Sequence, residues 1–167
     1  MKKIFLGLSV CAILFSACKK PNDKCPYSPN TASATTAERD ALRTILSNAS
    51  IANTEHSSGV FYNITVPGTG ANPDVCSNIT VKYTGSLVSN GQVFDSNAST
   101  SGTTFTLGNL IAGWQAILPL VKAGGKVTMY IPPSLGYGQQ NVRDNAGNLV
   151  IPGNSNLKFE MELLNVQ

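Results

Sequence analysis

The sequence predicts one α+β domain in which an antiparallel sheet wraps on a short helix. Beyond residue 58, apolar side chains recur at every second position, which is the period of half-buried strands. Turn signals such as Pro67-Gly68 and Asn90-Gly91 separate these runs. One short helical pattern interrupts them, and neither an internal repeat nor an alternating strand–helix–strand pattern occurs. These observations favour an antiparallel sheet over a parallel one.

The first residues have the features of an export signal. Lys2 and Lys3 precede the apolar run 4–15, which has the length of a signal-peptide core and is short for a transmembrane helix. Ser16-Ala17 then places small residues directly before Cys18, which resembles the lipobox of bacterial lipoproteins. That resemblance implies cleavage before Cys18 and acylation of its thiol. The alternative is an ordinary secretory signal in which this cysteine is incidental.

Cleavage at this position divides the N-terminal part of the chain. Residues 1–17 are then the signal peptide, and residues 18–34, rich in proline and small polar residues, form a lipid-anchored linker. We expect a membrane-anchored lipoprotein of the cell envelope, facing the periplasm. The net charge of +3 includes the lysines of the signal and anchor, and no basic stripe with interleaved aromatic residues appears. Nucleic acid is therefore not an expected partner.

The cysteines are consistent with an oxidising compartment. Cys11 lies in the signal, and acylation occupies Cys18, so Cys25 and Cys76 remain. Two remaining thiols in an exported protein favour a disulfide. Two unpaired thiols, or a metal-binding pair, are the alternatives.

A helix and its connector are expected over residues 35–57. Thr35 and Glu38 have the spacing of a capping box, in which each residue's side chain bonds the other's backbone. Apolar residues follow at helical spacing, which predicts an amphipathic helix over 36–48. Packing or spacing, rather than catalysis, is its expected role.

Alternating apolar residues mark the strands of the remaining domain, 58–167. Strand-like alternation covers 62–66, 79–83, 127–131 and 157–163. In each run one face is apolar and the other is polar or charged. This pattern is typical of a sheet with one side packed on a core.

A hairpin and a short helix complete the predicted fold. Asn90-Gly91 lies between two apolar pairs and predicts a two-residue type I′ turn, which requires positive φ at both central positions. The helix is expected near 113–118, because Pro119 limits its extension. Leucine and isoleucine on both sides of Trp114 suggest that this helix packs on the concave face of a curved sheet.

Several catalytic systems lack their parts in this chain. His56 is the only histidine, so Ser-His-Asp, Cys-His and histidine-based zinc sites are not supported. No phosphate-binding or dinucleotide-binding glycine motif follows a strand. Residues 144–148 resemble part of a calcium loop but lack the terminal bidentate glutamate, so a hairpin turn is expected there. We expect neither a metal nor a cofactor.

A set of ordered motifs resembles the FKBP-type peptidyl-prolyl cis-trans isomerases. The motifs are Tyr83-Thr84-Gly85, Phe94-Asp95-Ser96, Gly113-Trp114, Tyr130-Ile131-Pro132-Pro133, Tyr137-Gly138 and the final strand Leu157–Leu163. The resemblance covers 58–167 and implies an FKBP-like half-barrel sheet wrapped on a short helix, preceded here by an N-terminal helix. It implies isomerisation of X-Pro bonds in exported, proline-containing proteins, assisting their folding without a cofactor. Macrolide immunosuppressants are the inhibitors that it implies.

The resemblance also implies a pocket and roles within it. The catalytic residues would be Tyr83, Asp95, Ile111 and Tyr137. The substrate-binding residues would be Phe94, Phe105, Leu110, Trp114, Val150, Ile151 and Phe159. Trp114 would form the floor under the prolyl ring, while the Ile111 N–H and the Tyr137 hydroxyl would hold the substrate. Asp95 would be a polar wall residue that orients its neighbours.

Two alternatives stay open from the residues alone. Trp114 and Phe159 are also what a simple hydrophobic core would contain. A non-catalytic chaperone or partner-binding module on the same fold would use the same pocket. The stretch 139–150 is longer and more polar than in the minimal family domain, and it is expected to overhang the site.

Overall fold

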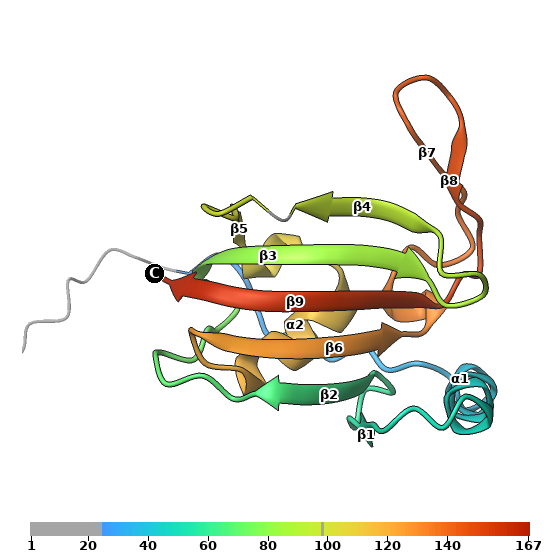
Figure 1. The fold of residues 1–167 in the computed structure, drawn as a ribbon, viewed down its shortest axis with the longest axis horizontal. Helices are drawn as coiled ribbons and strands as arrows, with labels where there is room; N and C mark the ends of the chain where they lie inside the picture. The colour runs from blue at the N-terminus through green and yellow to red at the C-terminus, as the bar shows by residue number, and fades with distance from the viewer. Residues whose placement is uncertain (1–24, 98) are drawn as a thin grey trace, which may run out of the picture.

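The computed structural model describes residues 25–97 and 99–167, which form an antiparallel sheet packed on one short helix, with a longer helix at one end (Figure 1). The elements, in chain order, are α1 (Thr36–Asn48), β1 (Thr54–Glu55), β2 (Phe61–Val66), β3 (Asn78–Leu87), β4 (Val93–Asn97), β5 (Thr103–Thr106), α2 (Ala112–Ile117), β6 (Gly125–Ile131), β7 (Val142–Arg143), β8 (Leu149–Ile151) and β9 (Leu157–Val166). Short 3₁₀ turns cover Leu107–Asn109, Leu118–Leu120 and Pro133–Leu135. The predicted α+β class is confirmed.

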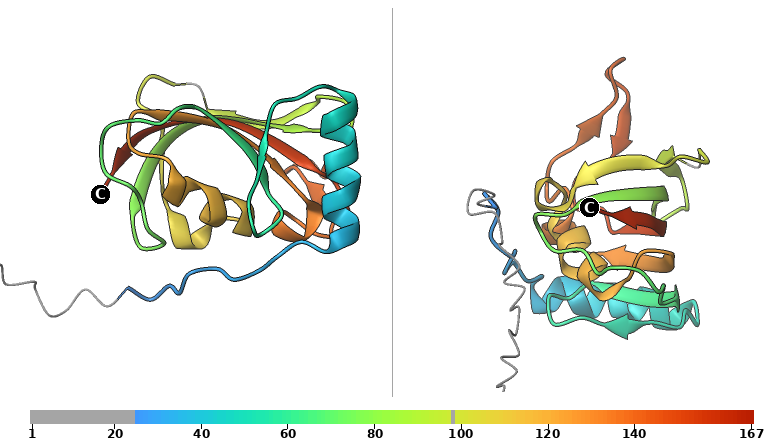
Figure 2. Two further views of the ribbon diagram at one scale, coloured as in Figure 1. Left: turned by 90° about the horizontal axis from the view of Figure 1, so that it is seen from below. Right: turned by 90° about the vertical axis from the view of Figure 1, so that its left-hand side faces the viewer.

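The main sheet has the order β1-β2-β6-β9-β3-β4, and β5 also pairs with β3. All of these pairs are antiparallel, and β9 lies between β6 and β3 along most of its length. Because Met129 pairs with Phe159, and Tyr83 with Met161, apolar side chains from neighbouring strands stack on one face. That face is concave and carries the main core (Figure 2).

The short helix α2 fills the concave face. Trp114 and Ile117 are buried, and Gly113 lies so close to β6 that a Cβ there would come within 2.6 Å of Ile131. Glycine thus permits the close approach of helix and strand, and Trp114 is carried into the centre of the curved sheet. The expectation from the apolar residues around Trp114 is met.

The N-terminal helix α1 packs on a second core at one end of the sheet (Figure 2). Its capping box is present, with the Thr35 and Glu38 side chains each bonded to the other's backbone. Leu42 and Leu46 are buried against Phe61 and Tyr130, which are paired across β2 and β6. Both faces of these strands are therefore covered here, which period-two alternation alone does not indicate.

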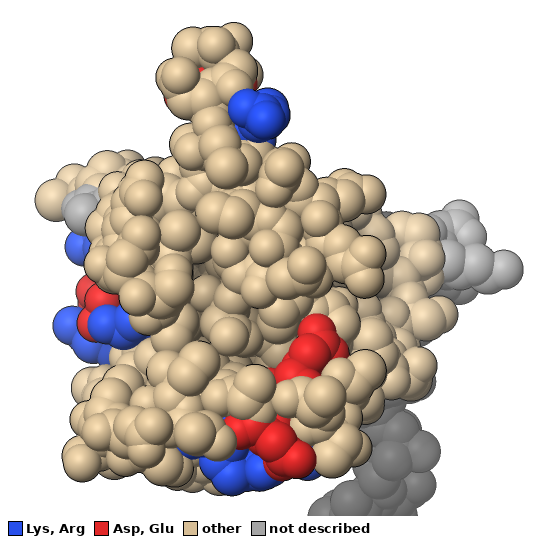
Figure 3. Space-filling model, turned by 90° about the vertical axis from the view of Figure 1, so that its right-hand side faces the viewer, with Lys and Arg blue, Asp and Glu red and all other residues tan. Residues whose placement is uncertain are grey.

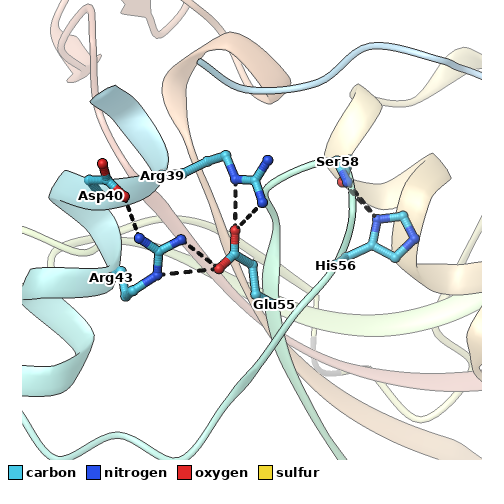
Figure 4. Close-up of polar contacts among 6 residues, drawn as sticks. All are labelled: Arg39, Asp40, Arg43, Glu55, His56 and Ser58. Atoms are coloured by element: carbon cyan, nitrogen blue, oxygen red, sulfur yellow. Dashed lines mark hydrogen bonds and ion pairs between the residues drawn. The ribbon is translucent and has the colours of Figure 1, made fainter. Parts of the chain in front are cut away.

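An ionic network ties α1 to β1. Arg39 and Arg43 both reach the Glu55 carboxylate, with N–O distances of 2.5 and 2.7 Å, and Arg43 also pairs with Asp40 (Figure 4). Hydrogen bonds from Arg43, opposed by burial and reinforced by Arg39, lower the pKa of Glu55. His56, further along this segment, contacts the Ser58 hydroxyl through Nδ1 at 2.8 Å. The histidine thus takes part in a local contact of the connector.

The predicted type I′ turn at Asn90-Gly91 is wrong, although the β3–β4 hairpin is present. Only Gly91 has a positive φ, of 72°. Its N–H donates to Leu87 O at 2.8 Å, which closes a wider loop, and the Asn90 side chain accepts the Gln92 N–H at 2.9 Å. This side-chain bond stabilises Asn90 without the left-handed conformation that a two-residue turn needs.

The described part of the expected linker lies along the domain. Cys25 and Cys76 form a disulfide, with their Cα atoms 5.6 Å apart. Tyr27 covers Gly108, where a Cβ would come within 2.3 Å of its ring, and Ala34 is buried in the main core. Residues 25–34 are therefore held by the domain, because apolar contacts and a crosslink fix them.

The signal peptide and the acylation site at Cys18 lie outside the described residues. Within the described ranges, no helix has both the length and the apolar character needed to cross a lipid bilayer.

Residues 142–151 form the hairpin β7–β8, which projects from the body of the molecule (Figure 1). The Asp144 carboxylate accepts the backbone N–H groups of Ala146 and Asn148 at 2.9 and 2.8 Å. Bonds from the Asn148 side chain and backbone are the main causes that lower the pKa of Asp144. The turn expected at 144–148 is present, and the part of the chain that the structure describes contains no group of three potential metal ligands.

Candidate active site

A cavity of about 170 Å³ opens between α2 and the concave face of the sheet. It is lined by Tyr83, Asp95, Phe105, Leu110, Ile111, Trp114, Tyr137 and Phe159. These residues come from β3, β4, β5, α2 with its preceding loop, the loop after β6, and β9. The fold thus gathers most of the residues named from sequence around one hollow.

Aromatic rings form the floor and sides of this cavity. Trp114 is 5% exposed and meets Tyr83, Phe105 and Phe159 edge-on, at ring-centroid distances of 5.5, 6.3 and 5.1 Å. Edge-to-face contacts of this kind fix the orientation of each ring. The Trp114 Nε1–H is buried and has no hydrogen-bond partner among the described residues. The floor is therefore aromatic, and its one polar group from Trp114 is a buried donor without an acceptor among the described residues.

One polar pair lies in the wall. The Tyr83 hydroxyl donates to Asp95 Oδ2 at 2.7 Å. The two residues come from adjacent strands, β3 and β4, so the sheet sets their distance. Burial, followed by the hydrogen bond to Asp95, raises the pKa of Tyr83 to about 12. Tyr83 therefore stays protonated near neutral pH and remains a donor to the carboxylate.

Besides the Trp114 Nε1–H, two donors at the cavity rim have no partner among the described residues. The Ile111 backbone N–H, at the start of α2, and the Tyr137 hydroxyl donate to none of the residues that the structure describes. Tyr137 is 39% exposed, and burial, then Asp95, raises its pKa. Its hydroxyl is thus protonated and available. A ligand with carbonyl oxygens would find two donors at the rim of an apolar hollow.

Three residues expected in the pocket do not line it. Phe94 packs edge-on against Phe159 with centroids 5.6 Å apart, and both rings fill the space beside Gly85. Ile151 is buried in the main core, and Val150 packs against that core at the base of the β7–β8 hairpin. Phe94 thus supports Phe159, which lines the cavity, while Ile151 and Val150 belong to the main core. Motif position alone does not distinguish a lining residue from one directly behind it.

The expected overhang of 139–150 is also not observed, because none of these residues lines the cavity. The two strands of this range pair with each other in a separate two-stranded sheet. This local pairing satisfies their backbone groups, so the hairpin stands apart from the cavity.

Sequence reasoning missed a residue that shapes the cavity rim. The Gln115 amide donates to the carbonyl oxygens of Leu110 and Gly108 at 2.7 and 3.2 Å. It holds the loop that carries Ile111. A polar side chain beside Trp114 in the predicted short helix was the available signal.

Comparison with known proteins agrees with this geometry. A family model described as FKBP-type peptidyl-prolyl cis-trans isomerase matches residues 70–164. The chain is 39% identical over 113 residues to the FKBP-type peptidyl-prolyl cis-trans isomerase FkpA of Escherichia coli K12, covering 66% of this chain and 39% of that protein. The corresponding protein of Buchnera aphidicola (Schizaphis graminum) is 41% identical over 113 residues, with coverages of 66% and 42%. The chain thus spans about two fifths of the length of these curated relatives.

Solved structures show the same fold. The crystal structure of FkpA from Escherichia coli aligns with a TM-score of 0.65 at 32% identity, covering 78% of this chain and 60% of that one. A peptidyl-prolyl cis-trans isomerase from Pseudomonas syringae pv. tomato DC3000 aligns with a TM-score of 0.65 at 31% identity, with coverages of 83% and 99%.

Proposed function

Because this chain belongs to the FKBP-type peptidyl-prolyl cis-trans isomerases, we propose that it catalyses rotation about X-Pro bonds in polypeptides. The observation that carries the proposal is the aromatic cavity, with two donors at its rim that bond to none of the described residues. The substrates would be proline-containing segments of proteins during folding.

The cavity suits the physics of this reaction. Rotation about an X-Pro bond has a barrier of about 18–20 kcal/mol, because amide resonance must be broken. The twisted amide has less charge separation than the planar one, so an apolar pocket favours it over water. Trp114 would lie beneath the prolyl ring, as its place on the cavity floor suggests. No covalent intermediate is needed.

The polar groups would act by selective hydrogen bonding. The Ile111 N–H would bind a substrate carbonyl, and the Tyr137 hydroxyl would donate a second bond that strengthens as the amide twists. Asp95 would act indirectly, since it accepts the Tyr83 hydroxyl and so holds that ring in the wall. In this scheme Tyr83 and Asp95 shape the site, and the two free donors contact the substrate.

A protease-coupled isomerisation assay with a proline-containing peptide tests the proposal. The wild type should accelerate isomerisation, and Tyr137→Phe should lower kcat/KM about twofold to tenfold, the value of one hydrogen bond. Tyr62→Phe is the matched control, because Tyr62 packs against the core and does not line the cavity.

Absence of acceleration by the folded wild type would refute the enzymatic proposal. Binding of unfolded chains without acceleration would instead support a non-catalytic chaperone. A macrolide immunosuppressant such as rapamycin should inhibit by competing for the same cavity.

We also propose export and lipid anchoring at Cys18, on the strength of the lipobox-like Ser16-Ala17-Cys18. The clients would then be exported proteins in the periplasm-facing envelope. Cys18→Ser should move the protein from the membrane fraction to the soluble fraction of fractionated cells. Unchanged membrane retention would contradict the anchor.

A further inference from the structure

One carboxylate joins parts of the chain that lie 96 residues apart. Glu38, in the first turn of α1, accepts the Ser134 backbone N–H on Oε1 and the Ser134 hydroxyl on Oε2, each at 2.9 Å. The same Oε2 accepts the Thr35 N–H at 2.9 Å. Glu38 therefore caps its own helix and also binds the loop after β6. It lies outside residues 70–164, which match the family model.

Ser134 stands at the start of the turn that presents Tyr137. Pro133 O accepts the N–H groups of Gly136 and Gly138, at 2.9 and 2.8 Å, so the backbone closes around Tyr137. The Tyr137 hydroxyl has no partner among the described residues, so the turn sets the position of its ring. Pro132 and Pro133 carry no N–H, which makes the Ser134 N–H the first donor that can anchor this end.

Two hydrogen bonds join α1 to this turn. Two open surface clefts, of about 320 and 370 Å³, lie beside this contact, and Glu38, Pro133 and Asn154 line both of them. Most of the face in Figure 3 is uncharged; its largest acidic area lies in the lower half of the view, and smaller ones lie beside basic side chains at the left edge and in the projecting hairpin. In the part of the chain that the structure describes, the hydrogen bonds between α1 and this turn both end on the Glu38 carboxylate.

The carboxylate is suited to this task. Burial by itself raises the pKa of Glu38, but the hydrogen bonds from Thr35 and Ser134 together outweigh burial and lower it. The group is therefore ionised at neutral pH. Hydrogen bonds to an ionised acceptor are about twice as strong as those between neutral groups.

We propose that Glu38 is a positioning residue for the isomerase reaction: by holding Ser134 it fixes the Pro133–Gly138 turn and so places the Tyr137 hydroxyl at the cavity. The inference rests on the proposed function. It assigns to the N-terminal helix a role in catalysis beyond packing. Glu38 acts through Tyr137 and does not itself contact substrate.

A double-mutant cycle tests this coupling. Glu38→Ala should lower kcat about threefold to tenfold with little change in KM, because a misplaced donor loses transition-state contact rather than binding. In a Tyr137→Phe background, Glu38→Ala should cause little further loss. Glu38→Gln should restore only part of the activity: its amide oxygen can accept the Ser134 N–H and its NH2 group can donate to the Ser134 hydroxyl, but the Thr35 N–H then loses its acceptor. Equal losses in both backgrounds would overturn the proposal.

Asp40→Ala is the matched control. It removes another carboxylate of α1, one that pairs with Arg43 and has no bond to Ser134. It should leave kcat unchanged. A loss equal to that of Glu38→Ala would show that helix charge or stability, and not the Ser134 contact, matters.

Amide hydrogen exchange gives a readout that does not require activity. Exchange at Ser134 and Gly138 should be faster in Glu38→Ala than in the wild type, and unchanged in Asp40→Ala. Unchanged exchange in Glu38→Ala would refute the proposal that Glu38 holds the Ser134 turn in place. If the wild type failed to isomerise peptides while exchange changed as expected, the proposed function would be refuted, but the role of Glu38 in holding the Ser134 turn would be supported.

Discussion

The two tyrosines of the cavity use their hydroxyls differently. Tyr83 donates to Asp95 at 2.7 Å, whereas the Tyr137 hydroxyl has no partner in the described chain. A hydroxyl already bonded to a carboxylate is less available to a substrate. The free Tyr137 hydroxyl is therefore the better candidate for substrate contact, and Tyr83 is better understood as a fixed wall.

The pH dependence of activity should reflect this chemistry. Burial and Asp95 raise the pKa of Tyr83 to about 12, and that of Tyr137 is raised as well. Since both phenols stay protonated, kcat/KM should show no loss on the basic side between about pH 6 and pH 9. Rate measurements across this range check the expectation, together with a separate measurement at each pH that the protein is still folded. A basic limb that disappears in Tyr83→Phe would contradict it.

The same shift has a consequence for stability. Because folding raises the pKa of Tyr83, its contribution is fully present below about pH 10 and is lost as the pH rises toward the folded value. Any loss of stability near neutral pH must come from other groups.

At the level of elements, α1 is an integral part of the fold rather than an appendage. Its buried leucines pack on Phe61 and Tyr130, and its two arginines bind Glu55 of β1. The exposed pairs of this network contribute little, since surface ion pairs are typically worth less than about 1 kcal/mol. Apolar burial is the main source of the docking energy.

Neighbouring positions of α1 offer a direct test of docking. Leu46 is fully buried, while Ile45 is 41% exposed. Leu46→Ala should lower the free energy of unfolding by about 2–5 kcal/mol, because it removes packed atoms and leaves a cavity. Ile45→Ala, the control, should cost less than about 1 kcal/mol. Urea denaturation measures both, and equal losses would indicate that α1 is not docked in solution.

For the whole molecule, the disulfide joins the N-terminal segment to the domain. Cys25 and Cys76 are 51 residues apart in sequence, and the segment between them contains α1, β1 and β2. A crosslink over such a loop restricts the unfolded chain strongly. It also keeps Tyr27 over Gly108, close to the loop that carries Ile111.

Removing the crosslink should lower stability without changing the fold. Cys76→Ser is expected to lower the free energy of unfolding by roughly 2–4 kcal/mol in the chain-entropy account. Cys25→Ser and the double variant should give the same loss, and dithiothreitol should affect only the wild type. Variants as stable as the oxidised wild type would show that the two thiols are not paired.

Local patterns in the sequence were sufficient for most of the fold. The capping box at Thr35 and Glu38, the period-two strands and the short helix around Trp114 all occur where expected. Each depends on residues close in sequence. The spacing of family motifs likewise indicated the residues that now line the cavity, because the sheet brings those motifs together.

Other features depended on partners far along the chain. Asn90 forms a side-chain bond instead of entering a type I′ turn, and Ile151 is buried in the main core instead of lining the cavity. Phe61 is buried on the second face of β2 because α1 packs there, and the Ser134 N–H is bonded because Glu38 of α1 reaches it.

The sequence by itself therefore determined the α+β class, the positions of the long strands along the chain and the chemical character of the pocket. Tertiary structure decided which side chains line that pocket, which stand behind it, and that α1 contacts the turn of Tyr137. The physical reason is that periodicity and capping report each residue's local backbone. Burial depends on how distant elements pack, and so do hydrogen bonds between residues as far apart in sequence as Glu38 and Ser134, which are separated by 96 positions.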